Sequence, residues 1–294
     1  MRRSAYIINF VIRNIKDMKE YCGSNFILNG ELQSVELFDN SLVYKGDSVY
    51  EVIRMVKGTP LFFKDHMERL SQSLQLKNKR QLADSSSLKK GIILLARSEK
   101  KKEINIKIVF NYNEGKDSYL IYYIDSIYPS KEQCKKGVRG LLFFAERKEP
   151  QSKIINYKLK TSVYQELINE GAYEALLVND ENLITEGSKS NIFFMKNSRL
   201  ITAPDDVILK GITRKHILQI CREEGIDVLF ECINADYISR YDAVFMTGTS
   251  PMVLPFCCIN DNYYDVANPL IEKLRSIYMK RAEASIHQFL EVNK

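Results

Sequence analysis

Short apolar runs separated by turn residues predict antiparallel strands in the first part of the chain. Runs at 26–28 and 31–32 flank Asn29-Gly30, and Asn-Gly is the typical two-residue turn of a β-hairpin. The same reasoning predicts a second hairpin through Lys57-Gly58 and two longer strands, with apolar runs at 49–56, 61–63, 104–112 and 119–124. These elements should form one antiparallel sheet.

Apolar residues with helical spacing lie between and after these strands. The spacing predicts helices over 64–76 and 87–97 in the first half and over 159–169, ended by Gly171, in the second. A helix is also expected after Gly211, with a stop at Gly225, and a long one over 268–291. Strands of the second half are predicted at 137–144, 175–179, 183–186, 192–195, 228–232 and 243–247.

The length of 294 residues favours two domains, because single domains centre on about 100–150 residues. Pro129, Ser130 and the mixed-charge run that follows predict a linker at 129–136. We therefore expect an N-terminal extension over 1–24, a small domain over 25–128 and a large domain over 137–294. Asn9 and Arg13 interrupt the apolar face of the extension, which argues against a signal peptide and leaves membrane-surface attachment as the weaker alternative.

The charge and the cysteine pattern exclude several classes of partner. The net charge of +6 is modest, and no aromatic-interleaved basic patch occurs, so we expect no nucleic-acid partner; a mildly basic surface suits small anionic substrates. The six cysteines lack metal-ligand spacing and only three histidines accompany them, so no metal site is expected. Scattered cysteines with mostly apolar neighbours indicate a reducing, cytoplasmic setting.

Three short patterns carry candidate chemistry. Glu186 ends an apolar run just before a small polar turn, where a carboxylate near buried strands needs a cationic or hydrogen-bonding partner. Gly211, Ile212 and Thr213 begin a helix, and free N–H groups at such an end suit an anion. Lys153 precedes two isoleucines, and desolvation there would lower its pKa and make the neutral amine a nucleophile. Each pattern by itself is more often a turn residue, a helix cap or a surface lysine.

Six segments in order make the chain resemble the class IV, or fold type IV, aminotransferases, a pyridoxal-phosphate family that includes branched-chain aminotransferases, D-amino acid aminotransferases and aminodeoxychorismate lyase. The segments are GDSVYEVIR at 46–54, KDHMERL at 64–70, KIINY at 153–157, YEALLVNDENLITEGSKSNIFF at 173–194, ILKGITR at 208–214 and TGTSPMVLP at 247–255. The resemblance implies a two-domain α+β or α/β fold, with a small α/β N-terminal domain and a larger pseudo-barrel C-terminal domain. It also implies pyridoxal 5'-phosphate as cofactor and a homodimer.

The resemblance implies a role for each matched position. Lys153 would form the Schiff base with the cofactor and then move the substrate proton, and Glu186 would pair with the pyridine nitrogen. The phosphate would be held by Arg69, Ile212, Thr213 and Thr249. Leu209 would lie behind the cofactor ring, Tyr157 would contact its hydroxyl, and the substrate would be lined by Tyr50, Arg54 and Ser250. Without the motif, Arg69 would be expected in a surface ion pair with Asp65 or Glu68, and Glu51 is expected to be structural or to bind an arginine.

Two specificity patterns of the family are missing. The segment 108–113 lacks the Arg-x-His pair of D-amino acid aminotransferases and the Tyr-x-Arg of branched-chain enzymes, and Lys45 stands where the latter have a tyrosine. Lys189, in the turn after Glu186, could reach an anion or point to solvent. We expect an aminotransferase that moves an amino group between a branched-chain L-amino acid or glutamate and a 2-oxo acid. The alternatives are an aminodeoxychorismate lyase-like elimination, a D-amino acid aminotransferase, and an inactive cofactor-binding protein.

Overall fold

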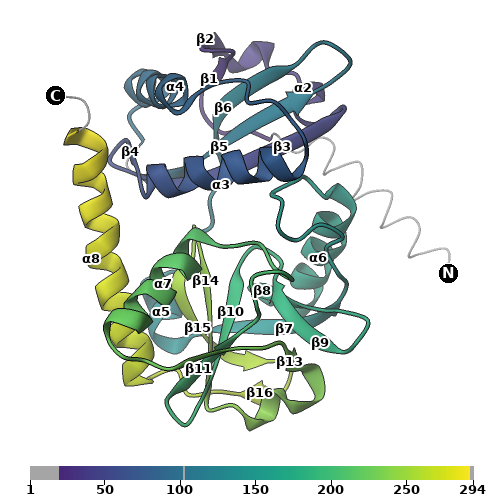
Figure 1. Cartoon of the computed structure of the whole chain (residues 1–294), viewed down its shortest axis with the longest axis vertical. Helices are drawn as coiled ribbons and strands as arrows, with labels where there is room; N and C mark the ends of the chain where they lie inside the picture. Colours follow the sequence, from purple (N-terminus) through teal and green to yellow (C-terminus); the bar gives the residue numbers. More distant parts are fainter. Residues whose placement is uncertain (1–19, 102, 292–294) are drawn as a thin grey trace.

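The chain folds around two sheets, one in each half (Figure 1), in a computed structural model that describes residues 20–101 and 103–291. The first sheet is antiparallel throughout, with the order β2-β1-β6-β5-β3-β4. Its strands are β1 (Asn25–Leu28), β2 (Glu31–Ser34), β3 (Asp47–Val56), β4 (Thr59–Pro60), β5 (Glu103–Tyr112) and β6 (Ser118–Ile124). We call this part the six-stranded unit.

Side chains of the six-stranded unit divide between two apolar clusters because neighbouring strand residues point to opposite faces. Helices α3 (Phe63–Leu76) and α4 (Ser85–Ser98) cover one face, where Ile53, Leu70 and Ile106 are fully buried. The short elements η1 (Val35–Leu37) and α2 (Ser41–Tyr44) lie on the other side, where Val109 and Tyr122 are buried. The second face also carries Tyr50 and Arg54, and so it is the face that matters for the site.

The second sheet is mixed and has ten strands, in the order β12-β11-β10-β14-β15-β7-β8-β9-β13, with β16 paired to β15. The β15–β7, β7–β8 and β11–β12 pairs are parallel. Its strands are β7 (Val138–Phe144), β8 (Glu174–Val178), β9 (Leu183–Gly187), β10 (Asn191–Lys196), β11 (Arg199–Thr202), β12 (Val228–Phe230), β13 (Ile233–Asn234), β14 (Ala243–Gly248), β15 (Met252–Ile259) and β16 (Asn262–Tyr263). We call this part the ten-stranded unit.

The helices of the second half connect and cover this sheet. They are α5 (Lys131–Lys136), α6 (Tyr157–Glu170), α7 (Ile212–Glu223), the 3-10 helix η2 (Ala235–Arg240) and α8 (Pro269–Glu291). Helix α8 packs on α7 and then runs along the side of the molecule to reach the six-stranded unit (Figure 1). In the described part of the chain, no helix is both long and apolar enough to cross a membrane.

Most predicted elements are present, but the prediction of a strand at 61–63 is wrong. The second strand of that hairpin is only Thr59–Pro60, because Phe62 turns the chain with φ 50° and α3 begins at Phe63. The strand expected at 228–232 stops at Phe230, and strands β11 and β15 were not predicted. Pro255 inside β15 and the two positive-φ residues before β11, Asn197 and Ser198, weaken the strand pattern there.

The segment predicted as a linker contains a short helix. Ser130 and Gln133 form a capping box at the start of α5, which explains why a polar, charged run is helical here. The expectations for residues 1–19 lie outside the described residues. Both units contribute to the core around α8, since Leu61 and Phe62 pack with Leu274 and Tyr278.

Candidate active site

The loop that carries Lys153 is attached to the six-stranded unit by its backbone. The Tyr50 N–H donates to the Lys153 carbonyl at 3.0 Å, and the Lys153 N–H donates to Ser73 Oγ at 3.3 Å. An isolated antiparallel bridge joins Val49 and Ile154. These contacts place the loop between β7 and α6 against strand β3, which brings Lys153 to the boundary between the two units.

The Lys153 side chain has the properties that its apolar neighbours predict. Its Nζ lies 5.0 Å from the centroid of the Tyr50 ring. Burial lowers the pKa of the Lys153 amine to about 7, and the nearby Arg69 cation acts in the same direction, while Glu51 opposes both. A large fraction of this amine is therefore neutral near pH 7, which a nucleophile or a proton acceptor requires.

Glu186 is a buried carboxylate at the end of β9, with only 3% of its surface exposed. The backbone N–H of Leu209 donates to Oε2 at 3.2 Å, and Arg147 Nε lies 3.2 Å from Oε1. Burial raises the pKa of Glu186 to about 7, with Arg147 acting in the opposite direction. Oε1 and Arg147 Nε form a close ion pair without hydrogen-bond geometry, so each atom lacks a hydrogen-bond partner within the described residues.

A second buried acid, Glu174, organises the turn that follows Glu186. Its Oε1 accepts hydrogen bonds from the Ser188 N–H at 3.1 Å and the Ser188 hydroxyl at 2.6 Å, and its Oε2 accepts one from Ser190 Oγ at 2.9 Å. The Ser188 carbonyl in turn accepts a hydrogen bond from Arg147. The turn therefore positions the arginine that faces Glu186. The Lys189 side chain is exposed, which fits the expectation that it points to solvent and not the one that it reaches an anion.

An anion cradle is formed where α7 begins. Gly211 is its N-cap residue and makes no side-chain capping bond, which leaves the first backbone N–H groups of the helix available. Ile212, Thr213 and Thr249 line one small pocket together with Arg54. The N-terminal dipole of a 12-residue helix favours negative charge at this point.

Arg69 lies next to this cradle. It does not form the surface ion pair with Asp65 or Glu68 that would be expected without the motif. Its guanidinium pairs with both oxygens of fully buried Glu51 at 2.7 and 2.8 Å, and it donates to the Lys210 carbonyl at 3.2 Å. His66 Nδ1 lies 2.8 Å from Glu51 Oε2, so His66 and Arg69 share one helical face, as their spacing predicts. Burial raises the pKa of Glu51, but Arg69 and His66 outweigh that effect and hold it below its ordinary value.

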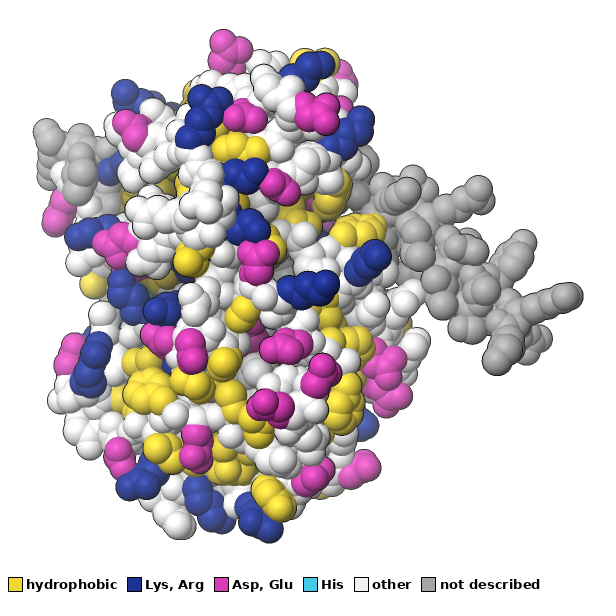
Figure 2. Space-filling model, turned by 45° about the vertical axis from the view of Figure 1, so that its right-hand side comes forward, with side chains coloured by type: hydrophobic (Ala, Val, Ile, Leu, Met, Phe, Trp, Pro, Cys, Tyr) yellow, Lys and Arg dark blue, Asp and Glu magenta, His cyan; other side chains and the backbone are white. Residues whose placement is uncertain are grey.

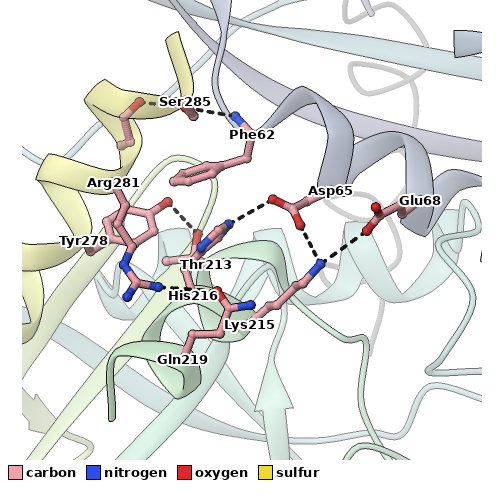
Figure 3. Close-up of polar contacts among 11 residues, drawn as sticks. Phe62, Asp65, Glu68, Thr213, Lys215, His216, Gln219, Tyr278, Arg281 and Ser285 are labelled. Carbon is pink, nitrogen blue, oxygen red and sulfur yellow. Dashed lines mark hydrogen bonds and ion pairs between the residues drawn. The ribbon is translucent and has the colours of Figure 1, made fainter. Parts of the chain in front are cut away.

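Behind the cradle, polar contacts join three helices (Figure 3). Thr213 Oγ1 lies 3.2 Å from the Tyr278 hydroxyl of α8. His216 Nε2 lies 3.0 Å from Asp65 Oδ2, and Lys215 pairs with the same carboxylate. These contacts position the first turn of α7 from both sides.

The substrate-side residues expected from the sequence also lie together. Arg54 donates to the Ser250 carbonyl at 2.9 Å and to Glu103 at 3.0 Å, and Asn105 Nδ2 donates to Ser250 Oγ at 2.8 Å. Thr249 Oγ1 is 3.4 Å from the carbonyl of Val52 in β3. Strand β3 and the loop between β14 and β15 therefore meet at the unit boundary, near Tyr50.

The remaining candidates are Leu209 and Tyr157. Leu209 is buried, and its carbonyl accepts a hydrogen bond from Asn191 at 2.9 Å. The Tyr157 ring packs edge-on against Tyr44 with a centroid distance of 5.6 Å, and its hydroxyl has no hydrogen-bond partner in the part of the chain that the structure describes.

Several residues of the candidate site have no sequence signal strong enough to single them out. Arg147 lies in an ordinary charged run, and Tyr278 lies in a long helix far along the chain. Glu174 could have been found, because an acid at the head of the apolar run Ala175–Val178 raises the same burial question as Glu186.

The polar groups of the site residues fit the chemical groups of pyridoxal 5'-phosphate. Buried polar atoms without a hydrogen-bond partner among the described residues include Glu186 Oε1 and the Tyr157 hydroxyl, which suit the pyridine nitrogen and the ring hydroxyl. The helix α7 N-terminus suits the phosphate, and the Lys153 amine suits the aldehyde.

The fold and the site together define an enzyme of the class IV aminotransferases. The sequence model described as amino-transferase class IV matches residues 48–259, and the chain belongs to this family, whose members depend on pyridoxal phosphate. The chain is 28% identical to a putative branched-chain-amino-acid aminotransferase of Methanocaldococcus jannaschii, over 90% of this chain and 97% of that protein. It is 27% identical to a D-alanine aminotransferase of Bacillus licheniformis, over 80% of this chain and 88% of the relative.

Among solved structures, the fold matches a branched-chain aminotransferase of the archaeon Thermoproteus uzoniensis with norvaline. The TM-score is 0.75 at 24% identity, covering 91% of this chain and 97% of that one. This match confirms the predicted mixed α+β, fold type IV architecture.

Proposed function

We propose that this enzyme transfers an amino group between a branched-chain L-amino acid or glutamate and a 2-oxo acid, with pyridoxal 5'-phosphate held by the residues described above. The observation that carries the proposal is that one site holds both the Lys153 amine and the Glu186 carboxyl, and that burial moves the pKa of each to about 7. The relative from Methanocaldococcus jannaschii, which covers 90% of the chain, supports the branched-chain assignment. The missing Arg-x-His pair argues against D-amino acids.

Each residue of the site would have a role that its position determines. When bound, the cofactor supplies an electron-withdrawing ring that stabilises negative charge at the substrate α-carbon. Lys153 Nζ, neutral near pH 7, would accept the α-proton and return it to the other side of the reacting bond. Glu186 Oε1 would hold a proton at the pyridine nitrogen, with Arg147 limiting how far the carboxyl can move.

The anion cradle would hold the phosphate. The N–H groups of Ile212 and Thr213 and the Thr249 hydroxyl would donate to it, and Arg69 would add positive charge while Glu51 holds its guanidinium. Leu209 would back the ring, and Tyr157 would reach its hydroxyl. Tyr50, Arg54 and Ser250 would line the substrate.

We also propose that the six-stranded unit and the ten-stranded unit are the small and large domains, and that the enzyme is a homodimer. Hydrophobic side chains gather over the ten-stranded unit on the face shown in Figure 2. In that unit Phe144 is 71%, Ile168 61% and Tyr263 80% exposed, and exposed apolar surface of this kind often marks an interface. Light scattering after size-exclusion chromatography should give twice the chain mass, and a monomer mass would contradict the proposal.

Product analysis tests the reaction. Protein supplied with pyridoxal phosphate, L-leucine and 2-oxoglutarate should form glutamate and the branched 2-oxo acid. Lys153→Ala should lose at least about 1000-fold in kcat, since it removes both the nucleophile and the base, whereas Lys158→Ala, which removes an exposed neighbour, should keep it.

Other products would change the assignment. Pyruvate and an aromatic amine from an aminated chorismate would point to the lyase, and turnover of D-alanine alone would overturn the stereochemical assignment. Bound cofactor with no turnover of any of these substrates would indicate an inactive binding protein.

A further inference from the structure

The hydroxyl of Tyr278 lies behind the anion cradle and has no role in the binding of the cofactor as proposed above. Tyr278 belongs to α8, which begins after residue 259, where the match to the family ends. It is 3% exposed and lines the same small pocket as Ile212, Thr213 and Thr249. Figure 3 shows its ring reaching from α8 to the first turn of α7. A side chain from outside the matched region therefore borders the place proposed for the phosphate.

Two hydroxyl groups share one hydrogen bond at this point. Thr213 Oγ1 lies 3.2 Å from the Tyr278 hydroxyl, and neither oxygen has another hydrogen-bond partner within residues 20–101 and 103–291. Each hydroxyl carries one proton, so one of the two protons has no acceptor there. A buried donor without an acceptor is costly, and an anion in the adjoining pocket would supply the acceptor.

The two hydroxyl groups differ in how readily they donate. A phenol is a better donor than an aliphatic alcohol, because its proton is more acidic. Burial raises the pKa of Tyr278 to about 12, against the opposing effect of the hydrogen bond with Thr213, so the phenol keeps its proton near neutral pH. The favoured arrangement therefore has Tyr278 donating to Thr213, which leaves the Thr213 proton free for the pocket.

Packing holds the Tyr278 ring where three helices meet (Figure 3). Its centroid lies 5.6 Å from that of the Phe62 ring, just before α3, and 6.5 Å from that of the His216 ring in α7. A side chain that is already fixed loses little conformational entropy when a ligand binds beside it. The hydroxyl is therefore in place before any phosphate arrives.

We propose that Tyr278 is a positioning residue for the cofactor phosphate, which donates to Thr213 Oγ1 and so directs the Thr213 proton to the phosphate. This inference rests on the proposed function, because it takes pyridoxal phosphate to bind in the anion cradle. A hydroxyl that accepts a hydrogen bond becomes a stronger donor, since the bonds of a chain polarise one another. Tyr278 therefore adds to the affinity for the phosphate without contacting it.

Two titrations of the full-length, cofactor-free protein isolate the contribution of the phosphate. Pyridoxal has the ring and aldehyde of pyridoxal phosphate but no phosphate, so the ratio of its dissociation constant to that of pyridoxal phosphate measures this contribution. Tyr278→Phe keeps the ring and removes the hydroxyl. It should lower the ratio about three- to tenfold, the size of one hydrogen bond, by weakening the binding of pyridoxal phosphate alone. An unchanged ratio would overturn the proposal.

Tyr264→Phe is the matched control. Tyr264 is buried in the ten-stranded unit, where its hydroxyl donates to the Ile238 carbonyl at 3.1 Å. The control also removes one buried hydroxyl and its hydrogen bond, so it should lower stability to a similar extent and leave the ratio unchanged. An equal fall of the ratio in both variants would assign the effect to general destabilisation and count against the positioning role.

A second substitution tests whether Tyr278 acts through Thr213. Thr213→Val keeps the shape of that side chain and removes its hydroxyl. In the Thr213→Val background, Tyr278→Phe should change the ratio by less than about twofold, because the group between Tyr278 and the phosphate is missing. Fully additive effects would mean that Tyr278 contacts the phosphate directly, and the proposed relay through Thr213 would be wrong.

The titrations also separate this inference from the proposed reaction. A protein that binds pyridoxal phosphate but forms no glutamate from L-leucine and 2-oxoglutarate would refute the proposed function, and the ratio would still decide the role of Tyr278. A wild type that binds pyridoxal phosphate no more tightly than pyridoxal would refute the anion cradle, and the role of Tyr278 with it.

Discussion

Lys153 and Glu186 show how burial can bring a base and an acid to the same range of pH. Desolvation penalises the charged form of each group, so it lowers the pKa of the amine and raises the pKa of the carboxyl, and both reach about 7. Neighbouring charges modify the effect: Arg69 adds to the shift of Lys153 and Glu51 opposes it, and Arg147 opposes the shift of Glu186. The site can therefore exchange a proton near neutral pH.

The titration of Lys153 should be visible in the cofactor-free protein. Reductive methylation followed by peptide mapping should show Lys153 becoming reactive with a midpoint near pH 7, with the exposed Lys158 as an internal reference. An ordinary lysine has a midpoint near pH ~10.4. A midpoint for Lys153 above about pH 9 would contradict the desolvation argument.

The same pKa shift has a defined sign for stability. The unfolded chain keeps the Lys153 proton up to about pH 10.4, whereas the folded chain releases it near pH 7, so wild-type stability should rise with pH between these values relative to Lys153→Met. At pH 7 the methionine variant should be more stable by about 3–5 kcal/mol in urea unfolding, and the difference should vanish by about pH 10.5. A constant difference across this range would contradict the shift.

Gly211, the N-cap residue of α7, connects the anion cradle to Glu186. Gly211 has ordinary backbone angles, φ −65° and ψ 138°, so a glycine is needed here for space and not for conformation. A Cβ at this position would lie 2.0 Å from Asn191 Oδ1. Asn191 donates to the Leu209 carbonyl, and the Leu209 N–H donates to Glu186. A side chain at position 211 that displaces Asn191 would therefore also shift the backbone group that binds the Glu186 carboxylate.

Gly211→Ala should therefore weaken cofactor binding as well as stability. We expect a loss of about 1–3 kcal/mol from overpacking and a rise of at least tenfold in the dissociation constant of pyridoxal phosphate, measured by fluorescence titration. Gly171→Ala is the control, since it places a Cβ in open space at a left-handed C-cap far from the site. It should destabilise by about 1 kcal/mol and leave cofactor affinity unchanged. Equal cofactor affinity in Gly211→Ala and the wild type would contradict the proposed link.

Helix α8 joins the two units into one molecule. Its C-terminal end lies against the six-stranded unit, where the Phe289 ring packs edge-on against Phe63 with a centroid distance of 5.3 Å. Lys89 of α4 lies 4.4 Å from the Phe289 ring centroid and donates to its carbonyl at 2.9 Å. One turn earlier, Ser285 Oγ accepts a hydrogen bond from the Phe62 N–H. The boundary that holds the site therefore depends on a helix outside the family motifs.

Phe289→Ala should loosen this connection. We expect a loss of about 3 kcal/mol in the free energy of unfolding, because a buried aromatic ring is removed, and separate rather than coincident urea transitions for the two units. Leu290→Ala, at a neighbouring position that is 50% exposed, should cost less than about 1 kcal/mol. Equal effects of the two substitutions would show that α8 does not couple the units.

The sequence by itself determined the features that depend on near neighbours. The hairpin at Asn29-Gly30 and the helix that follows Gly211 come from local turn chemistry and apolar periodicity. The ordered motifs added the family, which the comparison confirmed. Strand ends were less certain, since Phe62 and Pro255 interrupt the local patterns.

Only the tertiary structure decided which charges meet. Arg69 pairs with Glu51 rather than with its sequence neighbours, Arg147 faces Glu186, and Lys107 meets Glu20 across 87 positions of the chain. A buried charge needs a partner wherever the fold can supply one, and the partner is chosen by the stacking of strands and helices and not by proximity along the chain. For that reason the sequence indicates that a buried acid or amine must be paired, and the packing of the two units decides with what.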